Sequence, residues 1–379
     1  MKLSDYVIDY IATLGTKHIF LMTGGAIAHV VDSVGKRKHE KGDLDYICVQ
    51  HEQAGAMAAE TYSRFGPGLG VVLVTSGPGA TNLITGMCGC WFDSIPALFI
   101  SGQVNTAESI DVAKAKPRQV GFQETDIVSI VKSITKFAEK ITDPNQIKYF
   151  LDKAVYLAKE GRPGPVLIDL PIDLQLAEVN PGELLGFDPS KENIKSFVDS
   201  DEIILQKINE IIKLIKQAKR PVVLFGGGIK IGKAEKQALE FAEKLGFPVV
   251  VSWSGFDVLP HNHPQFAGHL GVYGNRGTNF AVQNSDLLIS LGSRLDTRQT
   301  GGRVNTFARG AKKVMVDIDR NEILKGRGLL IDIGVVADVG KFLELFLPKL
   351  AGIEKPDISS WVLKTKEWKD KYSAVLPEY

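Results

Sequence analysis

The sequence has few cysteines, no long apolar run and no signal-peptide pattern. Its 379 residues include three cysteines, Cys48, Cys88 and Cys90, which are too few for a disulfide framework. Cys88 and Cys90 have no nearby histidine to complete a metal site, so we interpret them as reduced thiols in the core. No apolar run reaches the ~18 residues that a membrane span needs, and the N-terminus lacks a continuous apolar segment. We therefore expect a cytoplasmic protein that makes no contact with a membrane.

An excess of one charge is also missing. Lys plus Arg number 45 and Asp plus Glu number 44, so nucleic acid is not an expected partner. The chain is 44% apolar, which excludes a disordered protein. At ~150 residues per domain, its length predicts two or three domains. Glycine is enriched, with 38 residues, and many of these follow strand-like runs, as expected where a ligand approaches the backbone.

Short apolar runs alternate with helical patterns in two regions of the chain. Continuous apolar strands between helices are typical of parallel sheets that are covered on both faces. We therefore predict an α/β fold with two doubly wound parallel-sheet domains. The strand-like runs are 18–22, 46–49, 70–74, 97–101 and 166–170 in the first region and 221–225, 248–252, 287–291 and 313–318 in the second.

The pattern also predicts the domain boundaries. Residues 1–175 form the first domain and residues 199–350 the second. Between them, residues 176–198 contain Pro, Gly and charged residues without periodicity, which is typical of a linker. Residues 351–379 are charged and loosely helical, and we expect them to be a tail that leads to a further domain.

Three strand-to-helix turns contain the residues of chemical interest. They are Met22-Thr-Gly-Gly-Ala26, Val49-Gln-His-Glu-Gln53 and Thr75-Ser-Gly-Pro-Gly-Ala-Thr-Asn82. Because open α/β sheets bind ligands at the carboxyl ends of their strands, the three turns could form one crevice. Glu52 also has a simpler explanation, since a carboxylate at a helix N-terminus interacts favourably with the helix dipole.

These turns occur in order with Phe122-Gln-Glu124 and Gly161-Arg-Pro-Gly-Pro165. With this combination, essentially the whole chain resembles the thiamine-diphosphate-dependent enzymes of the acetolactate synthase group. The resemblance implies a pyrimidine-binding domain followed by a Rossmann-like central domain. It further implies thiamine diphosphate and Mg²⁺ as cofactors, a 2-oxo acid substrate, and a homodimer or homotetramer.

The resemblance also implies roles for particular residues. Glu52 matches the glutamate that hydrogen-bonds the aminopyrimidine ring of the cofactor, which helps to remove the proton from its C2 carbon. Gln123 is expected to reach toward the thiazolium ring and the substrate, and is the second catalytic candidate. The other residues expected to bind the cofactor are Met22, Thr23, Gly24, Pro78 and Asn82.

The Gly-Asp-Gly motif through which this family binds Mg²⁺ and the diphosphate is missing from the sequence. We therefore predict no metal ligand in this chain. The resemblance implies that the motif belongs to a diphosphate-binding domain beyond the tail. Either the chain is a truncated product, which alone would be inactive, or a separate chain supplies that domain.

FAD binding by the second domain is left open. Some family members bind FAD there, whereas in others the domain is structural. The strand at 221–225 runs into a glycine-rich turn that departs from the dinucleotide-binding fingerprint. The residues that would contact FAD by this resemblance are Gly226, Gly227, Arg294, Asp296, Arg298 and Asp317.

Departures from the family pattern widen the functional prediction. Met22-Thr23 stands where acetolactate synthases commonly have Tyr-Pro, Phe137 follows Lys136 where they usually have His, and Lys116–Gly121 is atypical. We interpret all three as lying near the substrate. The first hypothesis is decarboxylation of pyruvate or another 2-oxo acid with carboligation to an acceptor. The alternatives are two-carbon transfer to a ketosugar in cell-envelope sugar biosynthesis, and a non-catalytic binding or assembly protein.

Overall fold

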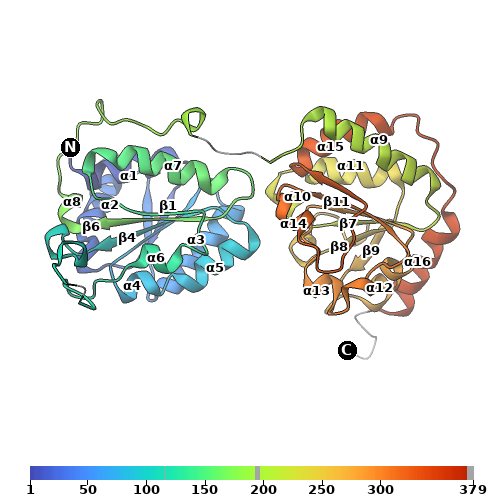
Figure 1. Ribbon diagram of the computed structural model, residues 1–379, viewed down its shortest axis with the longest axis horizontal. Helices are drawn as coiled ribbons and strands as arrows, with labels where there is room; N and C mark the ends of the chain where they lie inside the picture. Colours follow the sequence, from blue (N-terminus) through green and yellow to red (C-terminus); the bar gives the residue numbers. More distant parts are fainter. Residues whose placement is uncertain (116, 193–196, 374–379) are drawn as a thin grey trace. The chain divides into compact units, whose positions relative to one another are not determined.

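The computed structural model describes residues 1–115, 117–192 and 197–373 (Figure 1). The chain divides into two compact units, Met1–Ile194 and Lys195–Tyr379. In the described part, each unit contains one six-stranded sheet, and neighbouring strands pair in parallel throughout. Helices cover both faces of each sheet. The predicted α/β class with two doubly wound parallel sheets is therefore confirmed.

The sheet of the first unit has the strand order β2-β1-β3-β4-β6-β5. Its strands are β1 (His18–Leu21), β2 (Asp45–Cys48), β3 (Gly70–Val74), β4 (Ala97–Gln103), β5 (Phe137–Lys140) and β6 (Pro165–Pro171). Its helices are α1 (Leu3–Thr13), α2 (Ala28–Lys41), α3 (Glu52–Phe65), α4 (Pro78–Thr81), α5 (Ile84–Asp93), α6 (Ile127–Val131), α7 (Ile147–Lys159) and α8 (Ile172–Gln175).

Two apolar layers hold this sheet, because its central strands are buried on both faces. Along β4, Leu98 and Ile100 pack with residues of α1, α2 and α7. Ala97 and Phe99 point the other way and pack with residues of α3, α5 and α6. Figure 1 shows α1 and α7 on one side of the sheet and α4, α5 and α6 on the other. Side chains that alternate along one strand thus belong to different layers.

The sheet of the second unit has the order β12-β11-β10-β7-β8-β9, which is the strand order of a Rossmann fold. Its strands are β7 (Pro221–Phe225), β8 (Val249–Val251), β9 (Phe266–His269), β10 (Leu287–Leu291), β11 (Lys312–Asp317) and β12 (Ile333–Val336). Its helices are α9 (Asp201–Gln217), α10 (Gly228–Ile231), α11 (Glu235–Leu245), α12 (Arg276–Gln283), α13 (Thr297–Thr300), α14 (Arg320–Leu324), α15 (Val339–Phe346) and α16 (Ser359–Lys371).

The strand order reverses at one place in each sheet. In the first unit the chain passes from β1 outward to β2 and then returns to β3 on the other side of β1. In the second unit it passes from β7 outward to β9 and returns to β10 beside β7. Loops at the carboxyl ends of such strand pairs diverge, which opens a crevice where ligands bind in open α/β sheets.

The segments predicted as a linker and a tail are partly integrated into the two units. Lys2 forms an antiparallel bridge with Glu178, so the predicted linker begins against the first unit. Residues 193–196 of that linker lie outside the described part of the chain. In the predicted tail, the buried Trp361 on α16 donates its indole N–H to the carbonyl of Pro221 at 3.0 Å. Most of the tail therefore belongs to the second unit, and residues 374–379 lie outside the description.

Candidate active site

The three predicted turns follow three neighbouring strands, β2, β1 and β3. The first and third turns contact each other, because the backbone N–H of Ala26 donates to Oγ1 of Thr75 at 3.2 Å. A Cβ atom on Gly24 would lie 2.4 Å from Cβ of Thr75. Any larger residue at Gly24 would therefore push the two turns apart.

Glu52 is the first residue of α3, but the residue before it caps the helix. Nδ1 of His51 accepts a hydrogen bond from the backbone N–H of Gln53 at 3.2 Å. The Glu52 side chain instead points toward the third turn, where Nδ2 of Asn82 donates to its Oε2 at 2.9 Å. Glu52 is only 8% exposed, so its position is fixed by the crevice and does not depend on capping α3.

The second carboxylate oxygen of Glu52 remains available to a ligand. Within the described residues, Oε1 accepts no hydrogen bond from the protein. Gly79 borders it, since a Cβ atom there would lie 3.5 Å from Oε1. A protonated carboxyl oxygen can donate a hydrogen bond to the ring nitrogen of an aminopyrimidine, which is an acceptor. The residues present therefore fit the pyrimidine half of thiamine diphosphate.

Gln123 lies against the same crevice. A Cβ atom on Gly77, in the third turn, would come within 2.6 Å of the Gln123 carbonyl oxygen. Gln123 has a left-handed backbone with φ of 57°, a conformation that costs a non-glycine residue roughly 1–2 kcal/mol and persists only when its surroundings impose it. The structure thus brings Glu52, Asn82 and Gln123 to one edge of the sheet.

Glu124 orders the backbone around Gln123, a role that the sequence motif alone did not reveal. Its carboxylate accepts hydrogen bonds from the backbone N–H groups of Ile110 at 2.6 Å, Val120 at 3.0 Å and Gly121 at 3.3 Å, and from Oγ of Ser109 at 2.9 Å. Burial opposes ionisation of Glu124, but these donors outweigh it and lower the pKa of the carboxyl group.

A buried polar network beneath this segment was also missed. Asp169 on β6 is 1% exposed and accepts hydrogen bonds from Oγ of Ser101 at 2.7 Å and from Nε2 of Gln103 at 2.9 Å, both on β4. Burial raises the pKa of Asp169 to about 7, although the two hydrogen bonds act in the opposite direction. The sequence did contain one indication of this network, because Asp169 interrupts the otherwise apolar run 166–170.

The corresponding turns of the second unit are filled by the chain's own backbone. Beyond β7, a Cβ atom on Gly226 would lie 2.1 Å from the carbonyl oxygen of Gly292, which follows β10. A Cβ atom on Gly227 would lie 2.7 Å from Cβ of Ser254. These glycines allow turns of the unit to pack together, so they provide no open cradle for a dinucleotide phosphate.

The other candidates for FAD contacts have partners within the chain. Asp296 caps α13 by accepting from the backbone N–H of Arg298 at 2.7 Å. The Arg298 guanidinium lies 5.4 Å from the ring centre of Tyr273. Arg294 forms an ion pair of 3.5 Å with Asp296. The buried Asp317 accepts from the backbone N–H of Asp319 at 2.9 Å.

Comparison with known proteins shows the family of this chain. A model described as "Thiamine pyrophosphate enzyme, N-terminal TPP binding domain" matches residues 1–130. A second, "Thiamine pyrophosphate enzyme, central domain", matches residues 208–346. The chain belongs to the thiamine pyrophosphate enzymes. The predicted resemblance is thereby confirmed, and the crevice of the first unit lies within the match to the TPP binding domain.

Relatives of this thiamine pyrophosphate enzyme include acetolactate synthase large subunits. The protein of that name from Pyropia yezoensis is 34% identical over 98% of this chain, and that from Haemophilus influenzae is 33% identical over 97%. A probable acetolactate synthase large subunit from Methanocaldococcus jannaschii is 35% identical over 97%. The chain spans 61%, 62% and 59% of the lengths of these three relatives.

The remaining predicted residues of this thiamine pyrophosphate enzyme lie at the rim of the crevice. Met22 is half-buried in the first turn, whereas Thr23 beside it and Pro78 in the third turn are exposed. Phe137, interpreted from sequence as lying near the substrate, is elsewhere. It begins β5 and pairs with Val166 near the amino ends of the strands, so that interpretation was wrong. Lys116, in the atypical segment, lies outside the described residues.

The described residues contain neither a metal-binding cluster nor a membrane-spanning helix. No group of three or more His, Cys, Asp or Glu side chains in ranges 1–115, 117–192 and 197–373 is arranged to hold a metal ion. Nor does any helix in those ranges have the length and apolar content to cross a lipid bilayer.

Proposed function

We propose that this chain provides the pyrimidine side of a thiamine diphosphate site in an acetolactate-synthase-like enzyme. The enzyme would decarboxylate pyruvate or another 2-oxo acid and join the acyl group to an acceptor. One observation supports this most directly: Glu52 is buried, is held through Oε2 by Asn82, and keeps Oε1 available in the crevice between β1 and β3.

The residues of the chain have separate tasks in this proposal. When bound, thiamine diphosphate would supply the carbon-acid chemistry that the reaction needs. Glu52 would exchange a proton through Oε1 with a ring nitrogen of the bound cofactor. Asn82 fixes the orientation of the carboxyl group by donating to Oε2. Gly25, around which a Cβ atom would meet nothing within 4 Å, leaves space beside the first turn.

The Mg²⁺ and diphosphate side is not assigned to these 379 residues. The sequence has no Gly-Asp-Gly motif, and the described residues hold no cluster of three metal-ligating side chains. We therefore expect weak thiamine diphosphate binding by residues 1–379 alone, and calorimetry with and without Mg²⁺ tests this. Tight, Mg²⁺-dependent binding by these residues would contradict the proposed division of the site.

The acceptor is proposed to be a second 2-oxo acid. The support is that several relatives are named acetolactate synthase. The departure at Met22-Thr23, on the rim of the crevice, keeps the ketosugar acceptor as the alternative. Product analysis after incubation with pyruvate alone, and with pyruvate plus a ketosugar, distinguishes them. A protein that binds cofactor but forms neither product would support the non-catalytic alternative.

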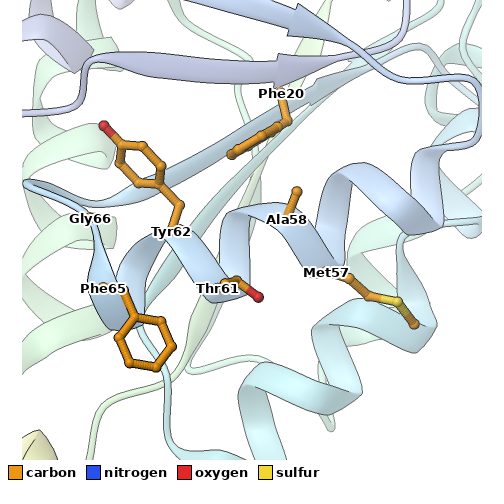
Figure 2. Close-up of a pocket in the computed structure, with 7 residues that line it drawn as sticks. All are labelled: Phe20, Met57, Ala58, Thr61, Tyr62, Phe65 and Gly66. Carbon is orange, nitrogen blue, oxygen red and sulfur yellow. The ribbon is translucent and has the colours of Figure 1, made fainter.

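We also propose a homo-oligomer, at least a dimer, in which a second copy covers α3 and α5. Figure 2 shows Met57, Thr61 and Phe65 projecting from α3, and the hollow there is also lined by Phe20 and Tyr62. A continuous exposed apolar surface normally marks an interface. A strict monomer in light scattering at high concentration would contradict this. The large apolar side chains exposed on the two helices are Met57, Phe65, Trp91 and Phe92.

FAD remains a testable addition in the second unit. Arg294 and Arg298 are polar groups at the carboxyl edge of its sheet and could contact a nucleotide, but the adjoining glycines are packed against backbone. The absorbance spectrum of the purified protein, before and after added FAD, tests this directly.

The decisive experiment substitutes Glu52 and its neighbour separately. In a preparation that turns over a 2-oxo acid, Glu52→Gln should slow exchange of the cofactor C2 proton by about 10²–10⁴-fold, because glutamine cannot cycle a proton. Stability should change little. The matched control, His51→Ala, removes the cap of α3 and should cost about 0.5–2 kcal/mol of stability while exchange stays normal. Normal exchange in Glu52→Gln with a lowered melting temperature would leave Glu52 with a structural role only.

A further inference from the structure

Gln103 connects the central sheet to the segment that contains Gln123. It is the last residue of β4 and is 4% exposed. Its Nε2 atom donates to Oδ2 of Asp169 and to the carbonyl oxygen of Thr125, both at 2.9 Å. Its Oε1 atom accepts from the backbone N–H of Val104 at 3.0 Å. Both amide protons and the amide oxygen are therefore used, and no apolar side chain could replace all three bonds.

Asp169 fixes the orientation of this amide. Ser101 and Asp169 are register partners on adjacent parallel strands, so their side chains lie on the same face of the sheet. On that face the preceding pair along the strands is apolar, Phe99 with Leu167. A flipped Gln103 amide would place its oxygen against both the Asp169 carboxylate and the Thr125 carbonyl. Since acceptors repel each other, only the orientation that donates to Thr125 is stable.

The carbonyl of Thr125 lies two residues beyond Gln123. It accepts from Gln103 and also from the backbone N–H of Ile127 at 2.9 Å. The following residue, Asp126, caps α6. Gln123 needs external support, because its left-handed backbone is unfavourable and its side chain is exposed. Glu124 supports the segment from the side of Ser109 and Ile110, whereas Gln103 supports it from the sheet.

Resting on the proposed function, we propose that Gln103 and Asp169 are positioning residues that hold segment 121–126 so that Gln123 stays against Gly77 at the crevice. Gln103 bonds the segment, and Asp169 keeps the Gln103 amide in the orientation that makes this bond. Neither side chain touches the proposed cofactor site. Their effect on the reaction would be transmitted through the backbone between Thr125 and Gln123.

The test compares two single substitutions that each remove one donor to Asp169. Gln103→Met has similar length and releases both Asp169 and Thr125, whereas Ser101→Ala releases Asp169 only. Amide hydrogen exchange of the 379-residue chain, without cofactor, gives the readout. We expect Gln103→Met to speed exchange at Glu124 and Ile127 by about tenfold or more. In Ser101→Ala these two amides should exchange as in the wild type.

Two further variants separate positioning from general stability. Asp169→Asn can accept from Gln103 through its oxygen and donate to Ser101 through its nitrogen, so the segment should stay protected. In the double variant Gln103→Glu with Asp169→Asn, the buried pair is restored but Thr125 lacks its donor. The melting temperature should then recover relative to Gln103→Glu alone, while exchange at Glu124 and Ile127 stays fast.

The proposal is overturned if Gln103→Met and Ser101→Ala speed exchange at these amides equally. It is also overturned if the increase extends over β3 and β4 in proportion to the loss of melting temperature. In the active enzyme, Gln103→Met combined with Gln123→Ala should lower kcat/KM no further than Gln123→Ala alone. Additive losses would contradict action through Gln123. Because exchange is measured without cofactor, failure of the thiamine diphosphate proposal would be seen separately, in the Glu52 experiment.

Discussion

The turns at the reversal of strand order contain closely packed glycines in both units, Gly24 and Gly77 in the first and Gly226 in the second. Beyond β1 and β3, the turns of the first unit surround Glu52 and leave its Oε1 atom available. Beyond β7 and β10, the turns of the second unit meet backbone to backbone, with Gly226 against Gly292. A glycine after a parallel strand therefore does not by itself indicate a ligand. What a Cβ atom would meet at that glycine distinguishes a packing position from an open one.

The largest effect is expected from filling the closed turn. Gly226→Ala would place a Cβ atom 2.1 Å from the carbonyl oxygen of Gly292, and two backbone segments cannot move apart without disturbing β7 and β10. We expect a loss of about 4–5 kcal/mol in the free energy of unfolding. Urea denaturation followed by tryptophan fluorescence measures it, since Trp361 is buried in the second unit.

The matched substitution in the open turn is Gly25→Ala. A Cβ atom at Gly25 would meet nothing within 4 Å, so stability should stay within about 0.5 kcal/mol of the wild type. Equal losses from Gly226→Ala and Gly25→Ala would remove the distinction between a closed and an open turn.

An intermediate effect is expected from Asp169→Asn, and it depends on pH. The pKa of Asp169 is raised to about 7 from an ordinary value of 3.8. Protonated Asp169 therefore stabilises the folded wild type. This contribution is complete below the unfolded-state pKa and is lost as the pH rises through the folded-state pKa. Asparagine does not titrate. The free energy of unfolding of Asp169→Asn should therefore rise relative to that of the wild type by roughly 2–4 kcal/mol between about pH 4 and 8. Melting curves across this range provide the measurement.

Glu124→Gln is the control for that pH series, because its effect on stability should change with pH in the opposite direction. The folded-state pKa of Glu124 is lowered, so its contribution is present above the unfolded-state pKa and is lost as pH falls. The gap between wild type and Glu124→Gln should therefore narrow in acid. Parallel trends for Asp169→Asn and Glu124→Gln would show that the pH dependence arises elsewhere in the molecule.

The smallest effect is expected from Arg298→Ala at the edge of the second sheet. Its guanidinium lies over the exposed ring of Tyr273, a contact worth about 0.5–1 kcal/mol at such a site. Stability should change by no more than that, and the flavin content of the purified protein should not change at all. A measurable loss of bound flavin would show that the closed turns of the second unit still hold a nucleotide.

Sequence patterns predicted the fold class because the central strands are continuous apolar runs between helices. Strands β5, β9 and β12 were not predicted. Their sequences, Phe137–Lys140, Phe266–His269 and Ile333–Val336, contain charged residues or glycine. Such strands are stabilised by the neighbours they pair with, and single-sequence patterns contain no information on those neighbours.

The sequence predicted the three turns of the candidate site, but not the hydrogen bonds between their residues. Glu52 and Asn82 are 30 positions apart, and their hydrogen bond was unknown until β2 and β3 were placed on either side of β1. Gln103 and Asp169 were missed for the same reason, because their partnership depends on the register of β4 with β6. The interpretation of Phe137 failed because a sequence motif does not reveal at which end of a strand a residue lies.

Helix α3 has a consequence for how the activity of this protein would respond to dilution. Glu52 is its first residue. Met57, Thr61 and Phe65 are spaced four residues apart along the surface proposed to meet a second copy. Over its 14 residues the helix is a rod of roughly 20 Å. If a second copy covers α3 as proposed, the same rigid element would connect subunit association with the position of Glu52, and specific activity should fall as the protein is diluted below the dissociation constant of the dimer.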